Sequence, residues 1–507
     1  MTNKKLLALV CANMLIASAS ATNYYASPSG TGDGTSHSTP CTLSSGISKL
    51  AAGDSLFLLG GQYDLNSTLT ISKSGTSASA RTFIGAYPKE KPILDFRNLK
   101  HGGNGISLKG NFVHMKGLTI RYAGYKGLYN SGSNNVMEAL DVYGNCDTGI
   151  QQKGGNSNTI LNCDSHDNFD FVTTENSYCN YGGNADGFAD KQYNNSPGNT
   201  YIGCRSWHNS DDGWDFYQRV GEATTIRNCV CFENGPQYYD LSNYARLATD
   251  DYWFKNFKKD TTVVTSDGKK YTCSISHYYN NGNGNGFKLG GGSTKHDVTL
   301  YNCLSVGNRV KGFDQNSDAG AIQIYNCTSY LNGSNYGFYN DNGYSLVIKN
   351  CISFPTSIKN SFSGSKITSS NNTWQTGFSC STSDFLSLDT TLVLKPRNDD
   401  GSLQITDLLR LKQGSTLIDK GVIIDGVEYN GAAPDLGCFE TDYTTAAIEE
   451  IPASKDDTFS RINIYDESGR LVAMSTDGNE TLASLPRGIY IIRSANANKM
   501  MVKKLKI

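Results

Sequence analysis

The central part of the sequence repeats about every 25 residues, and this repeat limits the possible folds more than any other feature. Each unit has an apolar residue, then Asn or Gly, then Cys, and later a Gly followed by an aromatic residue. The cysteines of the pattern are Cys163, Cys204, Cys229, Cys303, Cys327 and Cys351. The Gly–aromatic pairs are Gly187-Phe188, Gly213-Trp214, Gly286-Phe287, Gly312-Phe313 and Gly337-Phe338.

A repeat of this length, with short alternating stretches such as 321–325 (AIQIY), is typical of one coil of a β-solenoid. Equivalent positions of successive coils then stack at the strand spacing of about 4.8 Å. A leucine-rich or helical repeat is disfavoured, because the leucine signature is missing and helical periodicity is weak. Abundant Gly (53) and Tyr (30) with little Pro (11) suit many short strands. We therefore predict an all-β parallel β-helix.

The sequence divides into four parts. Residues 1–21 have two lysines, an apolar run and a final Ala-Ser-Ala, which is typical of a secretory signal peptide. Residues 22–440 hold the repeat, with a short capping helix expected at 42–50 and an irregular segment after about residue 372. Residues 441–458 are a polar linker, and 459–507 alternate again, which predicts a small separate β module.

Charge and hydropathy exclude some partners. Charged residues make up 18% of the chain and the formal net charge is −2, so there is no basic field to attract nucleic acid or anionic lipid. No later segment is apolar enough to span a bilayer. We expect an exported monomer, secreted or held at the cell surface.

The 14 cysteines of an exported chain raise the question of disulfides. The six repeat cysteines occupy one inward-facing position, so we expect them to be buried thiols that act as small hydrophobes. Disulfides are expected instead among the cysteines outside the repeat position, namely Cys41, Cys179, Cys231, Cys273, Cys380 and Cys438.

The stretch 210–217 (SDDGWDFY) places Asp211, Asp212 and Asp215 very close together. Like charges this close destabilise each other unless a cation or a proton lies between them. When the repeats are aligned on their Gly–aromatic pairs, Asp186 joins the same patch and Lys288 lies one coil further along. The alignment thus predicts four carboxylates beside one lysine.

Four carboxylates without His or Cys are hard oxygen ligands, which suit Ca²⁺. Two other interpretations stay open: the acids cap turns between strands, or they form a proton-sharing pair as in glycosidases. A lysine beside Ca²⁺ and shielded from water can lose its proton and act as a base. Without the metal, Lys288 beside Asp215 would be an ordinary salt bridge.

Three motifs resemble polysaccharide lyase family 9, the pectate and rhamnogalacturonan lyases, over roughly residues 22–440. The motifs are NADGFADK at 184–191, SDDGWD at 210–215 and NGFKLGG at 285–291. The C-terminal 49 residues resemble, more weakly, the sorting domains of type IX secretion.

The resemblance implies a right-handed parallel β-helix and an activity. Asp186, Asp211, Asp212 and Asp215 match the family's Ca²⁺ ligands, and Lys288 matches its catalytic base. The implied reaction is β-elimination on a uronic acid within a pectic polysaccharide, which leaves a 4,5-unsaturated sugar. Whether the polymer is polygalacturonate or rhamnogalacturonan I stays open.

Further residues are candidates for substrate binding. The lysines Lys191 and Lys311 and the arginine Arg309 could pair with neighbouring uronates, or be solvated surface charge. Trp207 or Tyr217 could stack on sugar rings, or pack in the core. An insertion rich in Tyr and Lys at 236–271 lengthens one repeat step to 73 residues, from 213 to 286, and could reshape the substrate groove.

Two alternative functions remain. A pectin hydrolase shares the fold, but the Gly-His-Gly and Arg-Ile-Lys motifs of that family are absent from the sequence. A non-catalytic carbohydrate-binding β-helix adhesin would not require Lys288 beside the acids.

Overall fold

The computed structural model describes residues 21–170, 174–175, 178–179, 181–192, 197–242, 244, 261–265, 267–404, 407–443, 461–466, 471–475, 489–496 and 499–506. The predicted signal peptide, apart from its last residue, and most of the predicted linker lie outside these residues. The chain forms two compact units, Met1–Glu440 and Thr441–Ile507.

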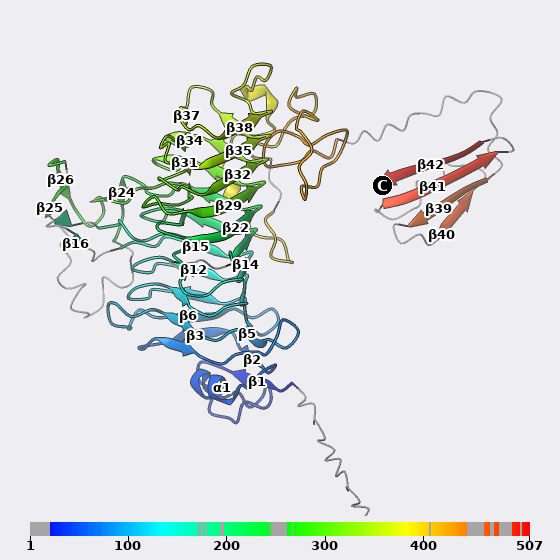
Figure 1. Ribbon diagram of the computed structural model, residues 1–507. Coiled ribbons are helices and arrows are strands. Elements are labelled where there is room, and N and C mark those ends of the chain that lie inside the picture. The colour runs from blue at the N-terminus through cyan, green and yellow to red at the C-terminus, as the bar shows by residue number, and fades with distance from the viewer. Residues whose placement is uncertain are drawn as a thin grey trace, which may run out of the picture. The chain divides into compact units, whose positions relative to one another are not determined.

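The first unit is a stack of coils, each of which contributes a strand to three long parallel sheets called A, B and C (Figure 1). Sheet A contains β1 (Asn23–Ala26), β2 (Ser55–Leu58), β5 (Thr82–Ala86), β8 (Val113–Lys116), β11 (Val136–Glu138), β14 (Thr159–Leu161), β19 (Thr200–Ile202), β22 (Gly221–Arg227), β29 (His296–Tyr301), β32 (Ala321–Tyr325), β35 (Ser345–Lys349) and β38 (Ile367–Ser370). Sheet B contains β3 (Gly61–Asp64), β6 (Pro92–Asp95), β9 (Thr119–Arg121), β12 (Asp141–Tyr143), β15 (Asp164–His166), β20 (Arg205–Trp207), β23 (Val230–Phe232), β30 (Leu304–Val306), β33 (Thr328–Tyr330) and β36 (Ile352–Phe354). Sheet C contains β4 (Leu69–Ile71), β7 (Ile106–Leu108), β10 (Leu128–Asn130), β13 (Ile150–Gln152), β18 (Phe188–Asp190), β21 (Trp214–Asp215), β28 (Phe287–Lys288), β31 (Lys311–Asp314), β34 (Ser334–Phe338) and β37 (Asn360–Phe362). The predicted parallel β-helix is confirmed.

The predicted capping helix is also present. Helix α1 (Leu43–Lys49) lies at the β1 end of the stack (Figure 1). The Thr42 side chain accepts a hydrogen bond from the Ser45 N–H at 3.2 Å, which satisfies one of the helix's unpaired donors. Leu43 and Ile47 are buried against the first coil. None of the described helices has the length and hydropathy of a membrane-spanning segment.

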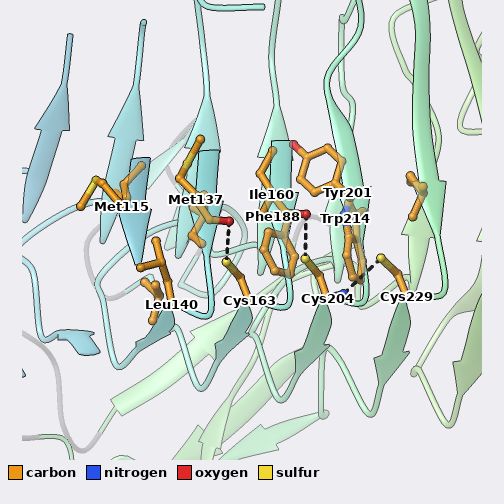
Figure 2. Packing of buried hydrophobic residues seen from close by; sticks show 14 of the residues in the cluster. Met115, Met137, Leu140, Ile160, Cys163, Phe188, Tyr201, Cys204, Trp214 and Cys229 are labelled. Carbon is orange, nitrogen blue, oxygen red and sulfur yellow. Dashed lines mark hydrogen bonds between the residues drawn. The ribbon is translucent and has the colours of Figure 1, made fainter. Parts of the chain in front are cut away.

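The six repeat cysteines are buried thiols in the main core, as predicted. Figure 2 shows how Cys163, Cys204 and Cys229 follow one another along the stack beside large apolar side chains. The thiols donate weak hydrogen bonds to the core-facing backbone, for example Cys163 Sγ to the Met137 carbonyl at 3.3 Å. In each coil, the thiol occupies a core position that has room for one small apolar side chain.

The expectation of disulfides outside the repeat position is wrong for the five described thiols. Cys41, Cys231, Cys273, Cys380 and Cys438 are all unpaired and buried. Cys231 lies in the core of the β-helix and Cys273 in a separate lateral cluster. Cys380 and Cys438 share a third cluster and are still unpaired. These thiols fill apolar sites, as the repeat cysteines do. The side chain of Cys179 is outside the described residues.

The Asn or Gly before each repeat cysteine has a backbone reason. Asn162, Asn228, Asn302, Asn326 and Asn350 have φ between 50° and 60°, and the equivalent residue of another coil is a glycine at 61°. This left-handed conformation turns the chain from sheet A into sheet B. Asn and Gly adopt it at the lowest cost.

A ladder of buried asparagines joins the coils at the turn from sheet B to sheet C. Each ladder residue lies five positions after the cysteine position, and its side chain bonds to the asparagine of the next coil. Asn308, for example, accepts from the N–H and Nδ2 of Asn234 at 3.0 and 2.9 Å, and its own N–H and Nδ2 bond to Asn332. The ladder is Asn145, Asn168, Asn209, Asn234, Asn308 and Asn332.

The Gly–aromatic pairs stack as the repeat alignment predicts, with one exception. A Cβ atom at Gly187 would lie 2.0 Å from Ser206 Oγ in the next coil, so only glycine fits there. The aromatic rings after the glycines pack on one another inside the core, from Phe188 through Trp214 and Phe287 to Phe313. The next ring is Tyr336, not the expected Phe338, because Phe313 pairs with Tyr336 and Asp314 with Gly337.

The insertion forms a lateral lobe. Strands β24 (Tyr238–Tyr239) and β27 (Tyr278–Tyr279) pair antiparallel, and so do β25 (Thr261–Val264) and β26 (Lys270–Cys273). Another hairpin, formed by β16 (Thr174–Glu175) and β17 (Tyr178–Cys179), lies between β15 and β18 in the chain. Phe169, Leu241 and the tyrosines of β27 belong to the lobe's own apolar cluster.

After β38 the repeat ends, as predicted. Two 3₁₀ helices, η2 (Thr382–Asp384) and η3 (Thr390–Leu394), and irregular chain follow. Leu408, Leu436 and Cys438 of this segment pack with Phe354 and Tyr330 of sheet B. The second unit is an antiparallel sheet in the order β40 (Leu471–Ser475), β39 (Arg461–Asp466), β41 (Ile489–Asn496), β42 (Lys499–Lys506).

The ladder yields a test of stability. Replacement of Asn308 by Ala leaves the Asn234 N–H buried without its acceptor, and each such loss costs about 1–3 kcal/mol. We expect Asn308→Ala to lower the free energy of unfolding by roughly 2–5 kcal/mol in urea denaturation. The exposed Asn398, replaced by Ala, serves as control. Equal stabilities of the two variants would show that the ladder does not hold the coils together.

Candidate functional site

The acidic residues of 210–215 lie where the turn from sheet B enters sheet C. Asp212 precedes Gly213 in this turn, and Asp215 ends β21. In the neighbouring coil Asp186 precedes Gly187 in the same way, and in the coil on the other side Lys288 pairs with Asp215 in register. The stack therefore places residues from three distant segments side by side.

Asp186, Asp212 and Asp215 form a buried acid triad. One carboxylate oxygen from each lies within 4.8 Å of the other two, and the residues are at most 3% exposed. Asp211 is also buried, but it is not part of this triad. Its carboxylate accepts a hydrogen bond from the backbone N–H of Asn283, at the edge of the lateral lobe.

Two lysines hold the triad. Lys288 Nζ lies 2.9 Å from Asp212 Oδ2 and 3.3 Å from Asp215 Oδ1. Lys191 Nζ lies 2.6 Å from Asp215 Oδ2 and 3.5 Å from Asp186 Oδ2. The Lys288 side chain is 9% exposed, whereas the Lys191 side chain is 20% exposed.

The environment shifts the pKa values of the carboxyl groups in opposite directions. Burial and the nearby charges of Asp212 raise the pKa of Asp211 well above its usual range, and burial raises the pKa of Asp186 in the same way. Burial would also raise the pKa of Asp215, but Lys191 and Lys288 lower it to about 2. Burial alone would lower the pKa of Lys288, but the surrounding carboxylates raise it well above its ordinary value.

Residues not singled out by the repeat alignment complete the site. Thr148, in the coil before Asp186, donates a hydrogen bond from its Oγ1 to Asp186 Oδ2, at a distance of 3.3 Å. Thr148 precedes Gly149 and occupies the same position as Asp186, but Ile150 replaces the aromatic residue, so a search for Gly–aromatic pairs misses it. At the end of β18, Arg219 Nε lies 3.2 Å from Asp190 Oδ1, and both side chains are fully buried.

The other two candidate cations lie apart from the acid triad. Lys311 Nζ donates to Asp314 Oδ2 at 3.1 Å and lies over the ring of Tyr339. Arg309 lines a separate open pocket of about 500 Å³ between the β-helix and the lateral lobe. Of the two candidate stacking residues, Trp207 is buried and stacks on His166 at 4.1 Å, so the exposed role is excluded for it. Tyr217 is 42% exposed.

Comparison with known proteins places the chain in a family. Residues 24–359 match the family described as Pel9A-like, right handed beta helix region. Pectate lyase L of Dickeya dadantii is 33% identical over 82% of this chain and 90% of its own length. Pectate lyase L of Paenibacillus polymyxa is 34% identical over 75% of this chain and 79% of its own length.

A solved structure agrees. The crystal structure of pectate lyase Pel9A is 32% identical, has a TM-score of 0.67, and is matched over 83% of this chain and 97% of that one. A rhamnogalacturonan lyase at 24% identity, with a TM-score of 0.61, shares the fold. The chain therefore belongs to the Pel9A-like right-handed β-helix family and is a polysaccharide lyase.

Proposed function

We propose that this protein is an exported Ca²⁺-dependent pectate lyase that cleaves polygalacturonate by β-elimination, with Lys288 as the base. The observation that carries the proposal is the contact of the Lys288 ammonium with two carboxylates of a buried acid triad. The similarity to pectate lyases supports the choice of substrate.

The residues fit a divalent cation. Asp186, Asp211, Asp212 and Asp215 carry four negative charges when ionised, and Lys191 and Lys288 supply two positive charges, which leaves −2. All the acid donors are oxygens, the ligands that Ca²⁺ prefers. The buried Oδ1 of Asn285, beside Asp212, has no hydrogen-bond partner in the described structure, and a bound cation would satisfy it.

The acid triad, with Asp211 at its edge, would hold the ion. Bound Ca²⁺ supplies positive charge that weakens the hold of the carboxylates on the Lys288 proton and that attracts the carboxylate of a uronate.

Lys288 then performs the proton transfer. Its neutral amine takes the proton from C5 of the uronate, the C5–H electron pair forms the C4=C5 double bond, and the C4–O bond breaks with the electron pair leaving on the glycosidic oxygen. That oxygen takes a proton from a water molecule and becomes the hydroxyl of the released sugar. Asp212 and Asp215 orient the Nζ atom, since both contact it. Asp212 does so from the turn before β21, and Asp215 from the end of that strand.

Other parts of the chain have proposed roles. Lys311 and Arg309 would bind carboxylates of neighbouring uronates, whereas Lys191 lies inside the acid cluster and would hold Asp215 and Asp186 in place. Residues 1–21 would direct export, 22–440 form the catalytic domain, 441–458 a linker, and 459–507 a type IX sorting module. The catalytic unit would act as a monomer.

Calcium binding tests the site directly. In calorimetric titration with CaCl₂ we expect Asp212→Asn to weaken binding by at least about tenfold, since even residues that support metal ligands contribute 10–100-fold. Asp314→Asn, a buried acid of the same sheet outside the triad, is the matched control. Unchanged affinity in Asp186→Asn, Asp212→Asn and Asp215→Asn alike would rule out the proposed ion site.

The base is tested by Lys288→Ala. Loss of a general base typically lowers the rate by a factor of about 10² to 10⁴. The rate at which ultraviolet absorbance of the unsaturated product increases should therefore fall by that factor, while Ca²⁺ still binds. Lys288→Arg should also be poor, because guanidinium stays protonated. Lys366→Ala, at an exposed position, controls for loss of positive charge. A normal rate for Lys288→Ala would contradict the assignment.

The domain assignment is tested by truncation. A chain that ends at Glu440 keeps the cluster of Leu408, Leu436 and Cys438 on sheet B, so it should fold and cleave polygalacturonate at the full rate. A truncated chain that folds but has lost turnover would show that Thr441–Ile507 contributes to catalysis.

A further inference from the structure

Two exposed tyrosines lie beside lysines on the sheet C side of the β-helix. Tyr217 is 42% exposed, and Lys288 Nζ lies 5.6 Å from its ring centre. Tyr339 is 47% exposed, and Lys311 Nζ lies 4.8 Å from its ring centre. Each tyrosine follows closely after a sheet C strand, β21 or β34.

The position of the Tyr217 ring is built by the residues around it. Its backbone N–H donates to Asp215 Oδ1 at 2.9 Å, so the residue is tied to the acid triad. A Cβ atom at Gly291 would lie 2.4 Å from Tyr217 Cδ2. The ring therefore lies directly against the backbone of the loop that follows Lys288.

The second pair is built in a similar way. Gly337 pairs with Asp314 in register, and a Cβ atom at Gly337 would lie 2.6 Å from Lys311 Cδ. The absence of a side chain at Gly337 lets Lys311 extend across β34, where its Nζ lies 3.4 Å from the Tyr339 hydroxyl.

A third tyrosine, on the other side of the acid triad, is different. Tyr125 is 37% exposed, but it covers Lys126 at 3.4 Å, and that ammonium is only 8% exposed and bound to Asp147 at 2.9 Å. Of these three rings, those of Tyr217 and Tyr339 are the more exposed, and their lysines lie further from the ring centre, at 5.6 and 4.8 Å, than Lys126 does.

We propose that Tyr217 and Tyr339 are stacking platforms for two separate sugar rings of the polyuronate. An aromatic face binds the apolar C–H face of a sugar, and the amine beside it faces the sugar's acidic part. Tyr217 positions the reacting uronate over Lys288, and Tyr339 with Lys311 binds a uronate further along the same polymer chain.

The spacing sets the direction and length of the substrate. Strands β21 and β34 are three steps apart in sheet C, which is about 14 Å at the strand spacing. One sugar ring cannot contact both tyrosines at this separation. The bound polymer therefore extends from the acid triad toward the C-terminal coils. This inference rests on the proposed lyase function.

The test is steady-state kinetics on galacturonate oligomers of increasing length and on the polymer. Tyr217→Ala should lower kcat/KM roughly 10- to 100-fold at every length, the effect of losing one buried apolar contact. Tyr217→Phe should keep most of the rate, because the ring face remains. Gly291→Ala should lower the rate as well, since its methyl group displaces the ring without removing it.

Tyr339→Ala should leave the shortest cleaved oligomer unchanged and raise KM roughly 10-fold for long oligomers. Tyr429→Ala, at an exposed tyrosine of the irregular segment, is the control. Circular dichroism and Tm of each variant should match the wild type.

The outcomes are distinguishable. A wild-type protein without activity on any uronate polymer would overturn the lyase proposal itself. An active wild type with Tyr217→Ala within twofold of it would overturn the Tyr217 platform. A Tyr339→Ala effect of the same size on the shortest and longest substrates would overturn the extended binding mode. Fluorescence titration of the Lys288→Ala variant with a long oligomer gives binding without turnover, and adding Tyr217→Ala should weaken it.

Discussion

Parallel, in-register stacking of the coils is the constraint on which the rest of this structure depends. Every coil has to place residues of like size and polarity at equivalent positions, because its neighbours lie only about 4.8 Å away. The ladder of asparagines, the thiols and the ring stack all follow from this rule. A side chain on Gly187 would meet Ser206 at 2.0 Å, which shows how little tolerance the turn has.

The same stacking explains how the acid triad can exist. Asp186 and Asp212 occupy equivalent positions in adjacent coils, so the fold holds them close together although like charges repel. The rigid ladder beside them resists separation of the turns. Lys191 and Lys288 offset part of the repulsion. The negative charge that remains uncompensated supports the proposal of a cation at this cluster.

Parts that depart from the repeat adapt the site. Two hydrogen bonds join the lateral lobe to the turn before β21. The Asn283 N–H donates to the Asp211 carboxylate, and Asn280 Nδ2 donates to the Ser210 carbonyl. The loop after β28 carries Gly291 against Tyr217. The acid triad and Lys288 thus lie at regular coil positions, where the strand register fixes their geometry. The contacts to Asp211, Ser210 and Tyr217 come from irregular segments.

The sequence by itself determined the parallel β-helix, the buried thiols and the juxtaposition of Asp186, Asp212, Asp215 and Lys288. It could do so because in-register stacking turns spacing along the chain into neighbourhood in space. The tertiary structure alone decided that Trp207 is buried while Tyr217 is exposed, that Lys191 joins the acid cluster, and that five further cysteines stay unpaired. It also moved the last ring of the stack from Phe338 to Tyr336. These features depend on side-chain directions and on loops of unequal length, which no repeat period encodes.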